Sequence, residues 1–166
     1  MPTLETERLL LRPFEERDLD EYAAILADPE VVRYLGQDPN SRDDAWRSMA
    51  GFLGHGVLRG YTNNVVVEKA SGRLLGRCGL WRPEGWPGLE VGWTLGRSFW
   101  GHGFATEAAV AWREYAFSVL GAVELCSVIH PDNSASIAVA RRIGHSYWWD
   151  VVVRGVPCVL YGQRTD

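Results

Sequence analysis

The pattern of apolar and polar positions in the first third of the chain predicts one strand followed by two helices. Residues Glu7 to Phe14 form a short apolar run closed by a proline, which is typical of a strand. Residues 17–30 and 41–53 are predicted to be helical. The Asp28-Pro29 pair is expected to end the first helix, and the glycines at 54, 56 and 60 are expected to break up the second.

Both predicted helices carry the same start signal, an N-cap residue followed three positions later by an acid. Asp18 is followed by Glu21 in the first helix, and Ser41 is followed by Asp44 in the second. This is the spacing of a capping box, in which the two side chains satisfy each other's backbone N–H groups. We therefore expect Asp18 and Ser41 to be the N-caps.

The remainder of the chain alternates strands with two more helices. Runs rich in β-branched and aromatic residues predict strands, and these are a hairpin over 61–83 that turns at Ala70–Arg73, single strands at 89–95 and 122–130, and a pair over 146–164 that turns at Arg154-Gly155. Apolar residues at helical spacing predict a helix from Phe104 to Val119. A shorter helix within 131–144 stops at Gly144.

This order of elements predicts the fold class. Antiparallel hairpins combined with a strand–helix–strand crossover give an α/β (α+β) protein whose sheet is mixed and covered by helices on both faces. The chain has 166 residues without repeats or linker-like stretches, so we expect a single domain over 1–166.

Composition narrows the classes of partner. A net charge of −4 argues against nucleic acid and suits a cationic acceptor such as an amine. No apolar run approaches the roughly 20 residues that span a bilayer, and the start of the chain lacks a signal-peptide pattern, so we expect no membrane partner and a cytoplasmic protein. The three cysteines form no C-x-x-C pair, so we expect buried free thiols and no metal site.

The stretch RSFWGHGFATEA, residues 97–108, is the strongest chemical signal in the chain. A strand, a glycine-rich loop and a helix N-terminus together form an anion site, because free backbone N–H groups converge there and glycine lets the anion come close. A P-loop needs a Gly-Lys pair, which the chain lacks. A dinucleotide-binding fingerprint would place a third glycine where Thr106 stands, so both of these phosphate-binding patterns are excluded.

Three motifs in order resemble a known family. LEVGWTLGRSFWGHGFATEAAVAWREYAF, HPDNSASIAVARRIGHSYWWD and the opening LETERLLLRPFEERDLDEYAAILADPEVVRYLG resemble the GNAT superfamily of acyl-CoA N-acyltransferases, in particular its branch of ribosomal-protein N-terminal acetyltransferases. The resemblance covers nearly the whole chain. It implies the GNAT fold, with a mostly antiparallel sheet splayed open between strands 90–95 and 123–130.

The resemblance also implies which residues hold acetyl-CoA. In the splayed strand the backbone would pair with the acyl-pantetheine arm, the glycine turn would bind the pyrophosphate, and an asparagine would bond the pantetheine. These residues are Trp93, Thr94, Leu95, Arg97, Gly101, His102, Gly103, Phe104, Ala105, Thr106 and Asn133. The family usually has Gln or Arg where Ser98 stands, and whether Arg97 compensates is open.

The resemblance suggests Glu90 and Ser136 as catalytic residues. Glu90 would be the general base that takes a proton from the amine, and Ser136 would be a proton donor to the thiolate. A solvated strand acid would look the same as Glu90, and Asn133 and Ser136 are also ordinary helix caps. Many family members carry a tyrosine general acid where Ala140 stands here, so tyrosine-mediated protonation at this position is set aside.

Aromatic residues and histidines are weaker signals. Trp46, Trp81 and Trp86 lie in segments expected to border the acceptor, although core packing explains each equally well. His130 and His145 are expected to be structural.

The sequence therefore predicts an N-acetyltransferase that moves an acetyl group from acetyl-CoA directly to a primary amine, on a peptide or a small molecule. A non-catalytic acyl-CoA-binding regulatory domain is the alternative, and a nucleotide-binding module is a third. The oligomeric state is open, with a homodimer as one option.

Overall fold

The computed structural model describes residues 1–36 and 39–165. Within these residues eight strands form one sheet in the order β1-β2-β3-β4-β5-β6-β8-β7. The strands are β1 (Leu4–Glu5), β2 (Leu9–Arg12), β3 (Asn63–Glu68), β4 (Leu74–Trp81), β5 (Glu90–Leu95), β6 (Glu124–Ile129), β7 (Ser146–Val153) and β8 (Val156–Arg164). The helices of the described ranges are α1 (Leu19–Leu26), α2 (Pro29–Val32), α3 (Arg42–Arg59), α4 (Phe104–Ser118) and α5 (Ser134–Arg142), with short 3-10 turns η1 (Glu16–Asp18) and η2 (Arg97–Phe99).

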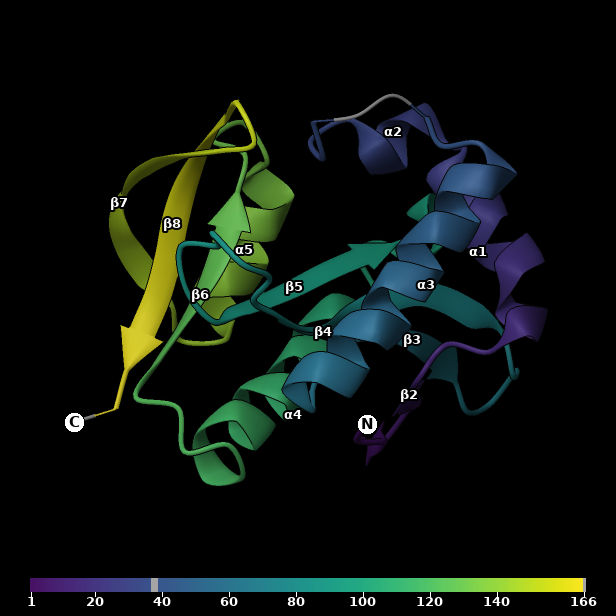
Figure 1. The fold of residues 1–166 in the computed structure, drawn as a ribbon, viewed down its shortest axis with the longest axis horizontal. Helices are drawn as coiled ribbons and strands as arrows, with labels where there is room; N and C mark the ends of the chain where they lie inside the picture. The colour runs from purple at the N-terminus through teal and green to yellow at the C-terminus, as the bar shows by residue number, and fades with distance from the viewer. Residues whose placement is uncertain (37–38, 166) are drawn as a thin grey trace.

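The sheet is mixed, mostly antiparallel and splayed. The neighbours β5 and β6 are parallel and share a single register pair, Glu90 with Cys126, whereas the other neighbours run antiparallel. Figure 1 shows the result: β6, β8, β7 and α5 lie to one side of β5, and β2–β4 with α1–α3 lie to the other. The predicted fold class is confirmed.

Two apolar cores cover the two faces of the sheet. On one face Trp112 of α4 is fully buried against strand residues such as Leu80 and Val91. On the other face Phe52 of α3 packs with α1 and with Val65 of β3. This separation follows from the alternation of side chains along a strand.

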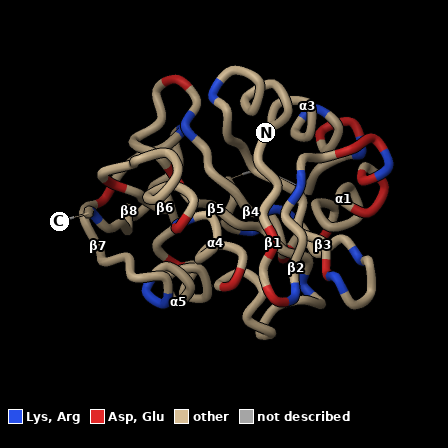
Figure 2. Tube along the Cα trace, turned by 90° about the horizontal axis from the view of Figure 1, so that it is seen from below, with Lys and Arg blue, Asp and Glu red and all other residues tan. Residues whose placement is uncertain are grey.

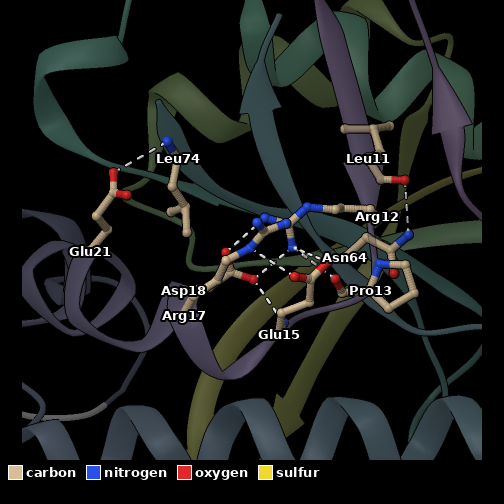
Figure 3. A network of polar contacts seen from close by, with 9 residues as sticks. All are labelled: Leu11, Arg12, Pro13, Glu15, Arg17, Asp18, Glu21, Asn64 and Leu74. Carbon is tan, nitrogen blue, oxygen red and sulfur yellow. Dashed lines mark hydrogen bonds and ion pairs between the residues drawn. The ribbon is translucent and has the colours of Figure 1, made fainter. Parts of the chain in front are cut away.

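The start of α1 differs from the prediction. Asp18 precedes α1 but makes no side-chain cap bond there; the capping box lies earlier, between Glu15 and Asp18, around η1. Asp18 instead accepts hydrogen bonds from both terminal nitrogens of Arg12, at 2.7 and 2.8 Å (Figure 3). A bidentate, charge-assisted pair is stronger than a neutral cap, so Asp18 faces β2 rather than Glu21. The Ser41–Asp44 capping box at α3 is confirmed.

The prediction that glycines 54 and 56 break the second helix was wrong. The helix α3 runs to Arg59 and ends at Gly60, whose φ of 80° is left-handed. A Cβ on Gly56 would overlap the Met1 side chain, so this glycine allows close packing instead of ending the helix. Tertiary contact therefore outweighs the low helix propensity of glycine.

Residues of both charges follow one another along the chain around α1 and the start of α3 (Figure 2). Arg42 at the start of α3 pairs with Asp20 of α1 at 2.8 Å. Within the described residues, 1–36 and 39–165, no helix is long and apolar enough to cross a bilayer.

Candidate active site

The splay between β5 and β6 begins directly after Glu90. Cys126 N–H donates to Leu89 O at 2.8 Å, which is the ladder bond of a parallel pair. Beyond it, side chains replace the ladder: Ser127 Oγ donates to Val91 O at 2.8 Å, and Val128 N–H donates to Glu90 Oε1 at 3.4 Å. Glu90 therefore lies at the point where the two strands separate.

Glu90 is a buried carboxyl group that titrates near neutral pH. Its side chain accepts a hydrogen bond of 2.6 Å from Trp86 Nε1, and the residue is 9% exposed. Burial raises the pKa of Glu90 to about 7, because the hydrogen bond from Trp86, the charge of Arg77 and the Val128 N–H only partly offset the loss of water. A carboxylate with this pKa can both accept and release a proton at physiological pH.

Glu90 lines a cavity of about 870 Å³. The cavity is bounded by α1, by the segment that follows α2 and by α3, by the facing side of β4 and β5, and by β6, α5 and the β7–β8 turn. Trp93, Asn133 and Ser136 line it together with Glu90, so the cavity brings these four residues together. This volume lies within the range typical of small-molecule sites.

The three tryptophans expected near the acceptor divide into two groups. Trp81 and Trp86 line the cavity. Trp46 does not: it is 47% exposed on α3, beside Glu16 and Leu19. The segment of Trp46 does line the cavity, through α3 residues such as Arg47 and Ser48, but the turn of the helix directs the Trp46 side chain to the outer surface.

The N-terminus of α5 places Asn133 and Ser136 at the cavity wall. Asn133 Oδ1 accepts from Ser136 N–H at 3.0 Å, so Asn133 caps the helix. Trp93 Nε1 donates to Ser136 Oγ at 3.3 Å and so links β5 to α5 across the splay. Because Ser136 Oγ is the acceptor in this bond, its own hydrogen can be donated elsewhere.

The glycine turn presents backbone N–H groups at the N-terminus of α4. Gly101 and Gly103 have φ of 79° and 81°, left-handed values that favour glycine. The first helical bond runs from Glu107 N–H to Gly103 O, so the amides of Phe104, Ala105 and Thr106 precede the helical ladder. Gly103 is the N-cap and has no side chain to occupy them.

The turn is anchored by residues that carry no functional signal in the sequence. Glu107 accepts from Thr6 Oγ1 at 2.6 Å, from Arg8 N–H at 2.9 Å and from Arg8 Nε at 2.7 Å. Arg8 also donates to His102 O at 3.1 Å. The connection between β1 and β2 therefore holds the glycine turn in place, through contacts between residues about a hundred positions apart in sequence.

The other coenzyme candidates are engaged within the protein. Arg97 pairs with Asp28 at 3.2 Å. Phe104 is 8% exposed and belongs to the α4 core, and His102 contributes its backbone carbonyl to Arg8. Thr94 is buried, and its hydroxyl has no hydrogen-bond partner among the described residues.

The two histidines that the sequence predicted to be structural differ in exposure. His130 lines the cavity with its ring 5.3 Å from that of Tyr34, centroid to centroid. His145 is buried beside Ser127, and burial together with the charge of Arg113 lowers its pKa to about 4, so the ring is neutral at pH 7.

All three cysteines are free, and two are fully buried as expected. Cys158 is only half-buried and lines the cavity, because its strand β8 packs against β6 at the cavity wall. Burial raises the pKa of Cys126 and of Cys158. Across residues 1–36 and 39–165, no group of three or more His, Cys, Asp or Glu side chains is arranged to hold a metal ion.

Sequence reasoning missed Tyr34 and Arg77, which also line the cavity. Arg77 had a readable signal, because it is a lone charge inside the otherwise apolar strand LLGRCGLW. Tyr34 had none, because it follows a four-residue helix that the pattern did not predict.

Comparisons with known proteins agree with this geometry. Residues 8–146 match the family described as "Acetyltransferase (GNAT) domain". The "Uncharacterized N-acetyltransferase p20" of Bacillus licheniformis is 34% identical, over 86% of this chain and 82% of that protein. The crystal structure of an acetyltransferase from Agrobacterium tumefaciens has a TM-score of 0.89 and 31% identity, covering 99% of this chain and 95% of that one.

A more distant solved structure shares the fold. It is RimL, a ribosomal α-N-protein acetyltransferase in complex with coenzyme A, with a TM-score of 0.80, 18% identity and 98% coverage of both chains.

Proposed function

Since the chain belongs to the GNAT acetyltransferase family and is an acetyl-CoA-dependent acyltransferase, we propose that it transfers the acetyl group directly to a primary amine with Glu90 as general base. The observation that carries this proposal is the Glu90 carboxyl group. It is buried at the point where the splay begins, it lines the cavity, and its pKa is about 7. A protonated amine cannot attack a thioester, so a base of this pKa is needed beside it.

The strand alternation of β5 suggests how the chain would hold the pantetheine arm. Leu89 O accepts from Cys126 N–H of β6, whereas Gly96 N–H donates to Leu75 O of β4. Backbone groups alternate in direction along a strand, so the odd-numbered residues of β5 direct theirs toward the splay and the even-numbered residues direct theirs toward β4. Trp93 and Leu95 would then meet the arm as an added strand does, while the backbone of Thr94 faces β4. Leu95 O already accepts from Trp100 Nε1 at 2.8 Å, which leaves its N–H.

The glycine turn and the start of α5 fit the remaining parts of the coenzyme. The amides of residues 101–106 would bind the pyrophosphate, with the dipole of the 15-residue helix α4 behind them. Asn133 would bond the pantetheine through its amide nitrogen. As the amine nitrogen bonds the acetyl carbon, Glu90 would hold the proton taken from the amine. When the carbon–sulfur bond breaks, Ser136 would donate its hydroxyl proton to the departing thiolate and regain a proton from water.

Direct transfer is supported by the state of the two cysteines near the site. Cys126 is 2% exposed and donates to Leu89 O at 3.3 Å. Cys158 lines the cavity, but burial and the charge of Glu90 raise its pKa. A thiol held in its protonated form is a poor nucleophile, so neither favours an acyl-enzyme.

The acceptor class that we propose is a peptide N-terminus or a small-molecule amine. RimL acts on a protein α-amine, which supports the former, and the volume of the cavity, about 870 Å³, suits the latter. Three free thiols fit the reducing cytoplasm as the place of action.

The test is acetylation by Glu90→Gln, measured as free-thiol release from acetyl-CoA with a panel of amines. The variant should keep coenzyme affinity within about twofold and lose roughly 10²–10⁴-fold in kcat. Glu124→Gln, which neutralises an exposed acid on the neighbouring strand β6, should leave kcat unchanged. If the wild type binds coenzyme but releases no thiol with any amine, the chain is a non-catalytic binding domain and the proposal fails.

A further inference from the structure

The wall of the cavity contains a guanidinium, that of Arg77, which makes no ion pair within the described residues. Arg77 is on β4, partly buried, and lines the cavity. Among residues 1–36 and 39–165 no carboxylate lies within 4.0 Å of it. Arg47, which also lines the cavity, pairs with Asp43 and Asp44.

The Arg77 side chain is fixed in place by two neutral contacts. Its Nη1 donates to Asn63 Oδ1 at 2.8 Å, and Asn63 is itself only 2% exposed. Its guanidinium carbon lies 5.3 Å from the centre of the Phe52 ring. A guanidinium has five N–H donors in a rigid fork, so one bond to Asn63 leaves donors for a second partner.

Arg77 and Glu90 lie on the same face of the sheet, at different positions along it. In the β4–β5 register Glu90 is opposite Trp81, and Arg77 is opposite Thr94, four residues further along. At about 3.3 Å per residue the two positions are roughly 13 Å apart along the strands. Between them on β5 is Gly92, which lines the cavity and has no side chain to fill it.

We propose that the acceptor is a primary amine that also carries a carboxylate, bound by Arg77 while its amine lies at Glu90. This inference rests on the proposed function. A carboxylate matches the fork of a guanidinium with two parallel hydrogen bonds. Because both side chains reach from these positions into one cavity, the arrangement suits an amine and a carboxylate carried by one small acceptor, from an amino acid to a short peptide.

The experiment compares acids with their amides as acceptors. Glycine, diglycine and triglycine are each paired with the C-terminal amide, and kcat/KM is measured by thiol release. A further pair, Gly-Glu amide and Gly-Gln amide, separates a side-chain carboxylate from a terminal one. In the wild type at least one acid should exceed its amide by about tenfold or more, as expected for a charge-assisted pair.

Arg77→Gln should abolish this preference by raising KM for the acid, so that the ratio of kcat/KM between acid and amide falls to about one. Because the charge of Arg77 also lowers the pKa of Glu90, its loss should slow both acceptors at neutral pH by the same factor, and the ratio is therefore the readout. Arg47→Gln is the matched control, because it removes a guanidinium that lines the same cavity but is already paired. It should keep the preference. Arg77→Lys, which retains the charge without the fork, should keep part of it.

A measurement on the wild type alone covers the case in which Arg77→Gln does not fold. Glycolylglycine, which has a hydroxyl in place of the amine, should inhibit acetylation of diglycinamide competitively, and its amide should not. Two results would overturn the inference: equal rates for acid and amide at every length, or an equal loss of both in Arg77→Gln. The proposed function fails separately, by the absence of thiol release with every acceptor.

Discussion

At the scale of single residues, Glu90 links catalysis and stability through one proton. Its carboxyl group is more stable protonated in the fold than in the unfolded chain, because burial raises its pKa from 4.5 to about 7. For an acid with a raised pKa, the stabilising contribution is complete below the unfolded pKa. It is lost as the pH rises through the folded pKa.

The acetylation rate and the stability of the fold should therefore change with pH in opposite directions. Acetylation, as kcat/KM, should rise with pH and level off above about 7, as Glu90 becomes the free base. Over pH 4.5 to 7 the wild type should lose up to about 3 kcal/mol of unfolding free energy relative to Glu90→Gln, which cannot ionise. Urea unfolding of both proteins across this range measures the difference. A constant difference would show that Glu90 is solvated.

At the scale of elements, glycines at the two ends of α4 allow the effect of backbone strain on stability to be measured separately from the effect of a side chain on ligand binding. Gly101 and Gly121 lie beyond opposite ends of α4, both have left-handed φ, and a Cβ on either would meet no atom within 4 Å. Alanine at each should therefore cost a similar amount of stability, about 1–2 kcal/mol. Only Gly101→Ala should weaken coenzyme A binding, by about tenfold or more, because only its methyl group enters the anion site.

Isothermal calorimetry with coenzyme A measures this affinity, and thermal unfolding measures the strain. Equal affinity in the two variants would contradict a role for the turn in phosphate binding.

Elements whose causes are local were predictable from the sequence. The turns at Ala70–Arg73 and Arg154-Gly155, the Ser41 cap and helix α4 depend on residues within a few positions of one another. The role of Gly56 was not readable, because the side chain that packs on it is Met1.

The candidate site follows the same division between local and distant causes. Glu90 was found through a contiguous motif, whereas the partners that define Arg77 come from β3 and α3. No spacing within one strand reveals partners supplied by two other elements.

At the scale of the whole molecule, one carboxylate connects the first strands to the site. Glu107 of α4 binds Thr6 and Arg8, and Arg8 in turn binds the carbonyl of His102 in the glycine turn. Burial alone would raise the pKa of Glu107, but the hydrogen bonds from Thr6 and Arg8 together outweigh it and hold the pKa below its ordinary value. The ionised form is therefore part of the folded structure.

Glu107→Gln should destabilise the protein by about 1–3 kcal/mol at pH 7, because it weakens charge-assisted bonds and leaves Arg8 unpaired. A lowered pKa contributes stability above the unfolded value that is lost as the pH falls through the folded value. The gap between variant and wild type should therefore close as the pH falls from 7 toward 3. Asp43→Asn, which breaks the exposed pair with Arg47, should change stability by less than about 0.5 kcal/mol.

Glu107→Gln should also weaken coenzyme A binding, although the Glu107 side chain contacts the connection between β1 and β2 and does not line the cavity. The reason is mechanical: Arg8 holds the His102 carbonyl only while Glu107 fixes its guanidinium. Titration calorimetry of Glu107→Gln and Asp43→Asn with coenzyme A distinguishes this effect from general destabilisation. If the two variants bind equally well, the N-terminal strands support the fold but not the turn.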